Sequence, residues 1–285
     1  MKRVGIVAKT DQPEAREVLP NLADWLGTRG KHVILEKETA GLLPAAGSAV
    51  EKRDLPAQVD LLVVLGGDGT LLSMARLVRA LGVPIFGVNL GGLGFLTATT
   101  LEELLPALED LFEGRMLVEE RMMLAARVRR QGKHLTECVA LNDVVITKSA
   151  MSRIIKLAVA VAGQAATDYR ADGLIISTPT GSTAYCLSAG GPIVYPTMDA
   201  LVLTPICSHT LTNRPIVLPA SLTLEVTLLT EHQEVMLTAD GQVGIALKAE
   251  DTVTISQAAS RIRLVRFPQK HFFSVLRSKL KWGEH

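Results

Sequence analysis

Short runs of apolar and often β-branched residues alternate with longer helical patterns from the start of the chain to about Phe112. The short runs predict strands, and the longer stretches, whose apolar positions recur every three or four residues, predict amphipathic helices. Because the two kinds of element alternate, they predict a parallel sheet covered by helices. The predicted strands cover residues 4–7, 32–35, 61–65 and 84–89, and the predicted helices cover 15–26, 70–81 and 101–112.

Beyond Met116 the apolar spacing changes from helical to alternating. Residues 122, 124, 126 and 128 are apolar on one parity, and residues 131–133 supply a turn. Further short strand candidates cover 154–161, 174–177, 222–228, 235–239, 243–247 and 253–256, and the stretch 272–280 returns to helical spacing. The second half of the chain therefore predicts an all-β domain followed by one helix.

These patterns predict two domains. We expect an α/β domain with a parallel sheet over residues 1–117 and a β-rich domain over residues 118–266. The closing segment, residues 267–285, is expected to return to the first domain. The length of 285 residues agrees with two domains of ordinary size.

The composition is that of an ordinary globular protein, with 48% hydrophobic and 21% charged residues and a formal net charge of +1. A charge this small gives no bulk attraction to nucleic acid, although a local basic cluster can still hold phosphates. The three widely spaced cysteines form no CxxC pair, which favours a reducing compartment. No apolar run approaches the roughly 20 residues that span a bilayer. The basic start and its short apolar run predict a first strand and not a signal peptide. We therefore expect a cytoplasmic protein with neither nucleic acid nor membrane as partner.

A glycine-rich turn follows the predicted strand 61–65. Its sequence, Gly-Gly-Asp-Gly-Thr over residues 66–70, leads directly into a helical pattern. Ligands of open α/β sheets bind at this end of a strand. Glycines let the backbone approach phosphate oxygens closely, and a helix start offers free N–H groups. A purely structural turn has no need of a carboxylate at its mouth, so Asp68 is a candidate catalytic residue.

A second glycine-rich loop, residues 90–96, follows the next predicted strand and is expected to lie beside the first. Further along, Asn142, Asp143 and the stretch 170–185 place amide, carboxylate and hydroxyl groups at strand ends. Such groups could recognise a base and a ribose by hydrogen bonds. Taken singly, Asn142-Asp143 and Asp172-Gly173 are also ordinary turn formers.

Together these segments resemble the NAD kinase family, in particular the bacterial ATP-NAD kinases. The matching segments are 66–70, 89–96 with its Gly-Phe-Leu ending, 142–143 and 172–185, and the resemblance extends over nearly the whole chain. It implies the layout of the family and of the wider diacylglycerol kinase-like superfamily: an α/β N-terminal domain, a β-rich C-terminal domain and a returning C-terminal segment. It also implies a homo-oligomer, either a tetramer or a dimer.

The resemblance further implies ATP-dependent phosphorylation of the adenosine-ribose 2′-hydroxyl of NAD to give NADP. Mg²⁺ or another divalent cation, free or bound to the nucleotide, is implied as cofactor, and some members also use polyphosphate or accept NADH. By resemblance Asp68 is the proton acceptor, and no residue is assigned as a metal ligand. The residues assigned to substrate or nucleotide binding are Gly69, Asn142, Asp143, Arg153, Arg170, Asp172, Thr183, Ala184, Tyr185, Cys186, Leu187, Ser188 and Gln242.

Alternative functions share parts of this pattern. A Walker A kinase is excluded because no Gly-x-x-x-x-Gly-Lys-Ser/Thr motif occurs. Lipid kinases and phosphofructokinases resemble the chain at the first glycine turn, but the polar segments at 142–143 and 180–185 favour NAD. A non-catalytic dinucleotide sensor would keep the pocket, although it would not need Asp68. The sequence leaves open whether Asp68 acts as a base or positions a metal ion.

Overall fold

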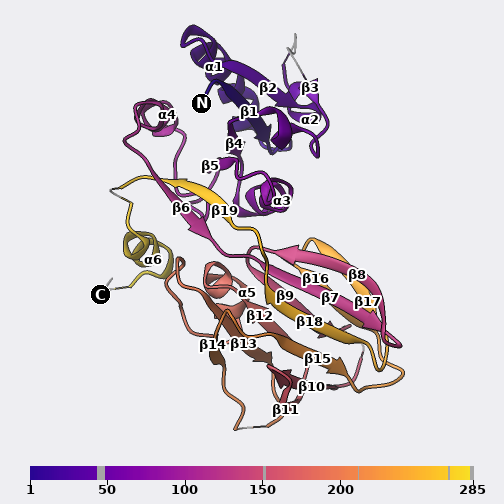
Figure 1. Ribbon diagram of the computed structural model, residues 1–285. Coiled ribbons are helices and arrows are strands. Elements are labelled where there is room, and N and C mark those ends of the chain that lie inside the picture. Colours follow the sequence, from indigo (N-terminus) through magenta and orange to yellow (C-terminus); the bar gives the residue numbers. More distant parts are fainter. Residues whose placement is uncertain (44–48, 150–151, 211, 269, 283–285) are drawn as a thin grey trace. The chain divides into compact units, whose positions relative to one another are not determined.

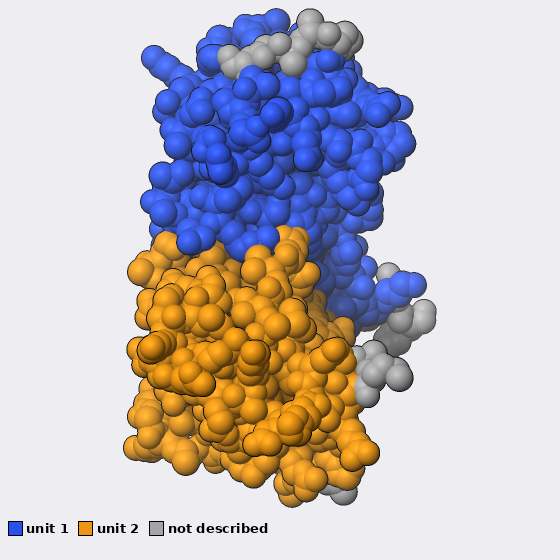
Figure 2. Space-filling model, turned by 90° about the vertical axis from the view of Figure 1, so that its right-hand side faces the viewer, with its two compact units in different colours: residues 1–120, 261–285 blue, residues 121–260 orange. Residues whose placement is uncertain are grey.

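The computed structural model describes residues 1–43, 49–149, 152–210, 212–268 and 270–282. The chain forms two compact units, residues 1–120 with 261–285 and residues 121–260, which are coloured separately in Figure 2. No helix within the described residues is both long enough and apolar enough to cross a membrane.

Unit 1 is built on a seven-stranded sheet of order β3-β2-β1-β4-β5-β19-β6 (Figure 1). The paired strands from β3 to β19 run parallel. Every residue of β4 and β5 is buried, because a parallel sheet with helices on both faces buries both sides of its central strands. The strands are β1 (Arg3–Ala8), β2 (His32–Glu36), β3 (Ala49–Val50), β4 (Leu61–Leu65), β5 (Pro84–Val88), β6 (Leu117–Arg121) and β19 (Ile262–Arg266).

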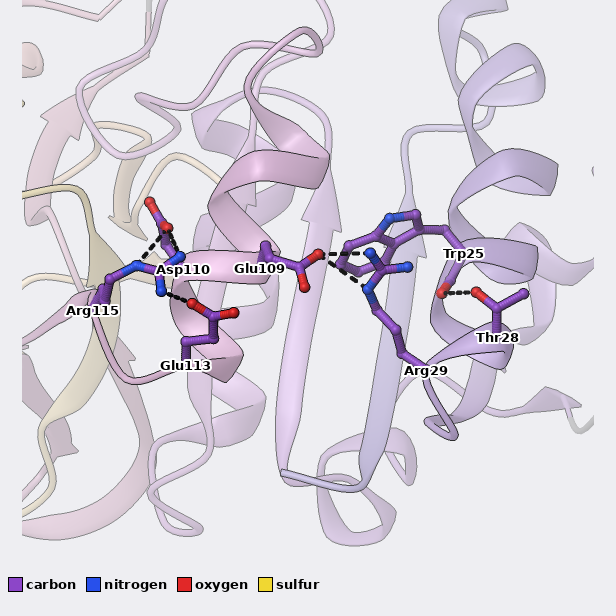
Figure 3. Close-up of polar contacts among 7 residues, drawn as sticks. All are labelled: Trp25, Thr28, Arg29, Glu109, Asp110, Glu113 and Arg115. Atoms are coloured by element: carbon purple, nitrogen blue, oxygen red, sulfur yellow. Dashed lines mark hydrogen bonds and ion pairs between the residues drawn. The ribbon is translucent and has the colours of Figure 1, made fainter.

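Two helices pack together on one face of this sheet, α1 (Pro13–Thr28) and α4 (Leu104–Phe112). The rings of Trp25 and Phe112 stack with centroids 6.3 Å apart. The guanidinium of Arg29 lies 3.8 Å from the Trp25 ring centroid and 2.7 Å from a carboxylate oxygen of Glu109 (Figure 3). Because both charges are partly exposed, this ion pair contributes about 1 kcal/mol or less, and the shared apolar core holds the helices together.

The helix α3 (Asp68–Val78) lies against the opposite face. A Cβ built at Gly87 of β5 would approach the Leu71 side chain to 2.7 Å, so the helix packs close to the strand backbone. The remaining helices of this unit are α2 (Lys37–Ala40), the 3₁₀ turn η1 (Leu55–Gln58) and α6 (Phe272–Leu280).

Unit 2 is a β-sandwich of two six-stranded sheets. Their orders are β11-β10-β15-β18-β7-β8 and β14-β13-β12-β9-β16-β17, and the registered pairs are antiparallel. The strands are β7 (Leu124–Arg130), β8 (Lys133–Ala140), β9 (Asp143–Lys148), β10 (Ile155–Val161), β11 (Gln164–Ala171), β12 (Gly173–Ser177), β13 (Ala200–Ile206), β14 (Ile216–Pro219), β15 (Leu224–Leu228), β16 (Val235–Ala239), β17 (Val243–Leu247) and β18 (Thr252–Gln257).

Near the centre of the second sheet, β12 and β13 are buried on both faces. Val144 and Ile146 of β9 join the core between the sheets, whereas Val145 belongs to a separate cluster on the outer face. That outer cluster includes Cys186, from the short helix α5 (Tyr185–Ser188), which follows the 3₁₀ turn η2 (Thr180–Thr183). Since side chains alternate along a strand, odd-numbered residues of β9 face η2 and α5.

The structure confirms the predicted fold class, an α/β unit with a parallel sheet and a mostly β unit. It also departs from the predicted elements at several places, for example in α3, β19 and β13. The helix α3 begins at Asp68, two residues before the predicted start. The strand β19 joins the sheet of unit 1, so that unit takes residues 261–285 and not only 267–285. The fully buried strand β13 has no alternating pattern and was not predicted.

Candidate active site

The glycine-rich turn lies at the point where the strand order of unit 1 reverses. From β1 the chain passes to β2 and β3 on one side of the sheet, and β4 and β5 lie on the other. Ligands bind outside the carboxyl ends of strands at such a switch point. Gly66 follows β4 there and donates its N–H to the carbonyl of Val88 at 2.8 Å. Asp68 then stands in the first turn of α3, where a carboxylate suits the helix dipole.

The carboxylate of Asp68 is held by the second glycine-rich loop. Its Oδ1 accepts hydrogen bonds from the backbone N–H groups of Leu96 (3.1 Å) and Thr97 (3.0 Å) and from the Thr97 hydroxyl (2.9 Å). Its Oδ2 accepts one from the N–H of Phe95 at 3.0 Å. All four partners are donors, which matches a carboxylate that acts only as an acceptor. The two glycine loops are therefore adjacent, as the sequence predicts.

Gly94 makes this contact possible. A Cβ at this position would lie 2.2 Å from Asp68 Oδ1 and 2.4 Å from Thr97 Oγ1, both far inside van der Waals contact. The loop is closed behind it by a hydrogen bond from Gly94 N–H to the Thr97 carbonyl at 3.2 Å. The amide of Asn89 donates to the buried Thr97 hydroxyl at 2.9 Å. Gly69, beyond Asp68, is exposed.

One cation near this turn was missed by the sequence reasoning. Lys9 follows β1 directly, and its N–H donates to the Leu65 carbonyl at 2.8 Å. Its Cβ would lie 3.2 Å from a Cβ at Gly66, so the lysine side chain begins beside the glycine turn. The signal that could have found it is its position, the first residue after a strand that borders the switch point.

In unit 2 a cavity of about 320 Å³ lies on the outer face of the second sheet. Asp143 and Thr147 line it from β9, and Thr238 lines it from the neighbouring β16. The full lining consists of Asn142, Asp143, Val145, Thr147, Ala184, Tyr185, Thr238, Asp240 and Gly241. Four of the residues predicted to bind substrate, Asn142, Asp143, Ala184 and Tyr185, therefore share one cavity.

Asp240 organises the first of these residues. Its carboxylate accepts hydrogen bonds from the backbone N–H groups of Leu141 (3.0 Å), Asn142 (2.7 Å) and Asp143 (3.3 Å). Burial, and then the negative charge of Asp240, raise the pKa of Asp143 from 3.8 to about 7. The sequence reasoning missed Asp240, because only the three-dimensional pairing of β9 with β16 brings it to this loop.

The segment from Thr178 to α5 packs tightly on the same loop. The Thr178 hydroxyl donates to the Leu141 carbonyl at 2.6 Å, and the Thr178 N–H donates to the Asn142 carbonyl at 2.8 Å. A Cβ at Gly181 would lie 2.1 Å from that carbonyl oxygen. Tyr185 is 46% exposed beside the cavity. Thr183 and Leu187 are half-buried, and Ser188 is exposed.

Cys186 is fully buried, and its sulfur lies 3.3 Å from the Thr204 hydroxyl. Burial raises the pKa of its thiol. The thiol packs against the outer face of the sheet and does not line the cavity.

The cavity lining also lacks Arg153, Arg170, Asp172 and Gln242. Arg153 and Arg170 are exposed, and Gln242 is exposed in the turn between β16 and β17. The carboxylate of Asp172 lies 3.6 Å from the ammonium of Lys148, the last residue of β9, whereas Asp143 is the first residue of that strand. Five strand residues from Asp143 to Lys148 span roughly 16 Å. Within one chain, Arg170 and Asp172 therefore do not join Asn142 and Asp143.

Comparison with known proteins agrees with this arrangement over the whole chain. The family model of the ATP-NAD kinase N-terminal domain matches residues 4–116, and that of the ATP-NAD kinase C-terminal domain matches residues 141–267. The NAD kinase of Geobacter sulfurreducens is 50% identical over 284 residues, and the NAD kinase of Syntrophobacter fumaroxidans is 46% identical over 286 residues. Each alignment covers 100% of both chains.

Two solved structures share the fold. The yeast NADH kinase complexed with NADH matches with a TM-score of 0.91 and 26% identity, over 100% of this chain and 89% of that one. The NAD kinase from Archaeoglobus fulgidus in complex with ATP matches with a TM-score of 0.76 and 26% identity, over 98% of both chains.

The fold and the site define a class of protein, a nucleotide-binding kinase outside the Walker A class. Its features are a parallel sheet with a carboxylate in the glycine turn at the switch point, and a β-sandwich with a polar cavity. With both family models and the full-length relatives, the assignment becomes specific. The chain belongs to the NAD kinase family.

The raised pKa of Asp143 predicts a pH-dependent stability. Between about pH 4 and pH 7 the folded protein holds the Asp143 proton while the unfolded chain has lost it, so this contribution to stability falls as the pH rises through that window. Asp143→Asn cannot ionise, so its melting temperature relative to the parent should be higher at about pH 8 than at about pH 5. Thermal melts of both proteins across this range test it, and a constant difference would contradict it.

Proposed function

We propose that Asp68 accepts the proton of the NAD 2′-hydroxyl during phosphoryl transfer, and that Asn142 and Asp143 hold the adenosine that carries this hydroxyl. The chain phosphorylates NAD with ATP to give NADP, the activity of the family to which it belongs. The single observation that supports the assignment of Asp68 is the asymmetric use of its two oxygens.

Oδ1 of Asp68 accepts three hydrogen bonds from the described residues, whereas Oδ2 accepts one. A carboxylate oxygen offers about two lone pairs, so Oδ2 is the atom with room for another donor. A ribose hydroxyl that donates to Oδ2 would be oriented for attack on the γ-phosphorus. The new O–P bond forms as the bond between the γ-phosphorus and the β,γ-bridging oxygen breaks, ADP leaves, and the hydroxyl proton passes to Oδ2.

On the substrate side, the cavity of unit 2 offers groups that suit a nucleoside. Asn142 carries an amide with both donors and acceptors for an adenine edge, and the Asp143 carboxyl can accept hydrogen bonds from ribose hydroxyls. Tyr185, partly exposed beside them, offers an aromatic face for a planar ligand. Gly69, Thr183 and Ser188 remain proposed contacts of the bound nucleotides.

A divalent cation is proposed as well, bound through the phosphates of ATP. Among the described residues, no three His, Cys, Asp or Glu side chains gather where they could hold a metal ion. The side chains therefore do not form a cage for the cation, whose chemistry is to neutralise phosphate charge. Polyphosphate as an alternative donor and a cytoplasmic location stay predictions.

A homo-oligomer, tetramer or dimer, is proposed on the positions of Arg170 and Asp172. These residues lie at the far end of β9 from Asp143, so a role in binding requires a pocket other than their own. A second copy of the chain would supply one. The mass of the assembly in solution tests this proposal, and a fully active monomer would contradict it.

The test of the function uses NAD analogues that each lack one hydroxyl of the adenosine ribose. Because the phosphoryl group goes to the 2′ oxygen, 2′-deoxy-NAD should compete with NAD and form no product, whereas the 3′-deoxy analogue should retain some turnover. The assay is run with ATP and Mg²⁺ and repeated with excess chelator, which should abolish turnover. Product from the 2′-deoxy analogue would contradict the assigned acceptor.

A further inference from the structure

The loop that holds Asp68 is itself held by the C-terminal segment of unit 1. The Lys270 ammonium donates to the carbonyl of Ala98 at 2.7 Å, and the Arg266 guanidinium donates to the carbonyl of Phe95 at 3.2 Å. These carbonyls belong to the same short loop whose N–H groups point to Asp68. Loop residues 94–98 are therefore fixed through their donors on one side and their acceptors on the other.

Phe95 shows the arrangement most directly. Its N–H donates to Asp68 Oδ2, and its carbonyl accepts from Arg266. A cation at a carbonyl and a carboxylate at nearby N–H groups polarise the intervening chain in the same sense, and each contact strengthens the other. Arg266 is only 9% exposed, so its charge is screened weakly by solvent.

Lys270 is anchored by a second partner. Its ammonium also forms an ion pair with Glu103, whose Oε2 accepts the N–H of Thr100 at 2.9 Å. Burial by itself would raise the pKa of Glu103, but the hydrogen bonds from Lys270 and Thr100 outweigh it, so the pKa is lowered. The Glu103 carboxylate therefore stays ionised at neutral pH, and it fixes the Lys270 ammonium beside the Ala98 carbonyl.

We infer that Thr97, Arg266 and Lys270 are positioning residues for Asp68: they fix loop 94–98, and that loop aims Oδ2 of Asp68 at the acceptor hydroxyl. None of them needs to touch a substrate. The inference rests on the proposed role of Asp68 in the reaction. Its structural part, that the C-terminal segment orders the loop, can be tested without any turnover.

The kinetic test compares Thr97→Val with Thr97→Ser. Valine keeps the β-branched shape but loses the hydroxyl that donates to Oδ1 and accepts from Asn89. Thr97→Val should lower kcat about tenfold or more, with the KM values for NAD and ATP within about threefold, because only the transition-state geometry is affected. Thr97→Ser restores the hydroxyl and should recover most of the lost kcat. If serine fails to restore it, Thr97 acts only through packing and the inference is wrong.

Lys270→Met extends the test to the C-terminal segment. It removes the ammonium and keeps an unbranched apolar side chain, and Lys279→Met, at an exposed lysine of α6, is the matched control. Lys270→Met should lower kcat at unchanged KM, and the control should not. Combined with Asp68→Asn, Lys270→Met should cause no further loss, because residues that act through one group are not additive. A loss of full size in the double variant would overturn the inference.

Amide hydrogen exchange in the full-length protein supplies the readout that does not depend on activity. The amides of Phe95, Leu96 and Thr97 should exchange at least about tenfold faster in Lys270→Met than in the parent or the control, because the loop opens more often. Unchanged exchange would overturn the inference even if kcat fell. If the parent protein did not phosphorylate NAD, the proposed function would fail. The exchange experiment would still decide whether the C-terminal segment of unit 1 orders loop 94–98.

Discussion

Asp68→Asn is expected to lower kcat by roughly 10²–10⁴-fold, the usual contribution of general base catalysis, while the KM values for NAD and ATP change little. The amide keeps the size and polarity of the carboxylate but cannot accept the hydroxyl proton. It also replaces one acceptor oxygen by an NH₂ group. This NH₂ group would face backbone N–H groups of loop 94–98, which are donors too, so at least one of their hydrogen bonds is lost.

This second effect gives the variant a signature that a pure base would lack. Loop 94–98 should exchange its amide hydrogens faster in Asp68→Asn, because the variant loses acceptors for them. Steady-state kinetics and hydrogen exchange on the same sample measure both effects, and Asp24→Asn, at an exposed carboxylate of α1, is the control. If kcat stays within about twofold of the parent, Asp68 is not the base. If KM alone rises, it contributes to binding instead.

The α/β architecture was predictable because its central strands are simple in pattern. The run 61–65 is wholly apolar and ends in glycines, and the observed β4 covers the same residues. The helix predicted over 272–280 is α6 with the same limits. In both cases the signal is local: a continuous apolar run for a strand buried on both faces, and a helical period for an amphipathic helix.

Other strands carried no such signal. β11 is largely exposed and polar over Gln164–Ala171, so alternation is weak there, although the strand pairs fully with β10. β13 is buried throughout and has no alternation to read. The pairing of β19 with β5 joins residues about 180 positions apart in the chain, and no local pattern indicates it. Tertiary pairing decides these strands, since strand propensity depends strongly on context.

In the candidate site, too, some residues could be proposed from local sequence patterns and others could not. Asp68, Asn142 and Asp143 could be proposed from glycine turns and from polar residues at strand ends. The hydrogen-bond partners of these residues could not be proposed, because they are distant in the sequence. The donors to Asp68 lie 27 to 29 residues away, and Asp240 lies 97 to 99 residues from the backbone N–H groups that donate to it. The sequence assigned no contact to Asp240 or Asn89, and only the fold shows that each fixes a neighbouring loop.

Gly94→Ala is expected to cause the second-largest loss of activity, about 10²-fold in kcat. Its added methyl group would lie 2.2 Å from Asp68 Oδ1, where no atom can remain, so either the carboxylate or loop 94–98 must move. A displacement of about 1 Å in a catalytic group can cost about that factor. Because Gly94 does not have a positive φ, the substitution introduces no backbone strain that would obscure this steric effect.

Gly92→Ala is the matched variant, since it adds the same methyl group two residues earlier, within the second glycine-rich loop (residues 90–96). A Cβ at Gly92 has no neighbour within 4 Å, and its φ is not positive either. Both variants share the loss of backbone freedom in the unfolded chain, so the difference between them isolates the contact with Asp68. We expect kcat of Gly94→Ala to lie at least about tenfold below that of Gly92→Ala. The melting temperatures of the two variants should be similar by comparison. Equal kcat values would show that the carboxylate does not need its observed position, and the role of the second glycine loop in catalysis would have to be abandoned.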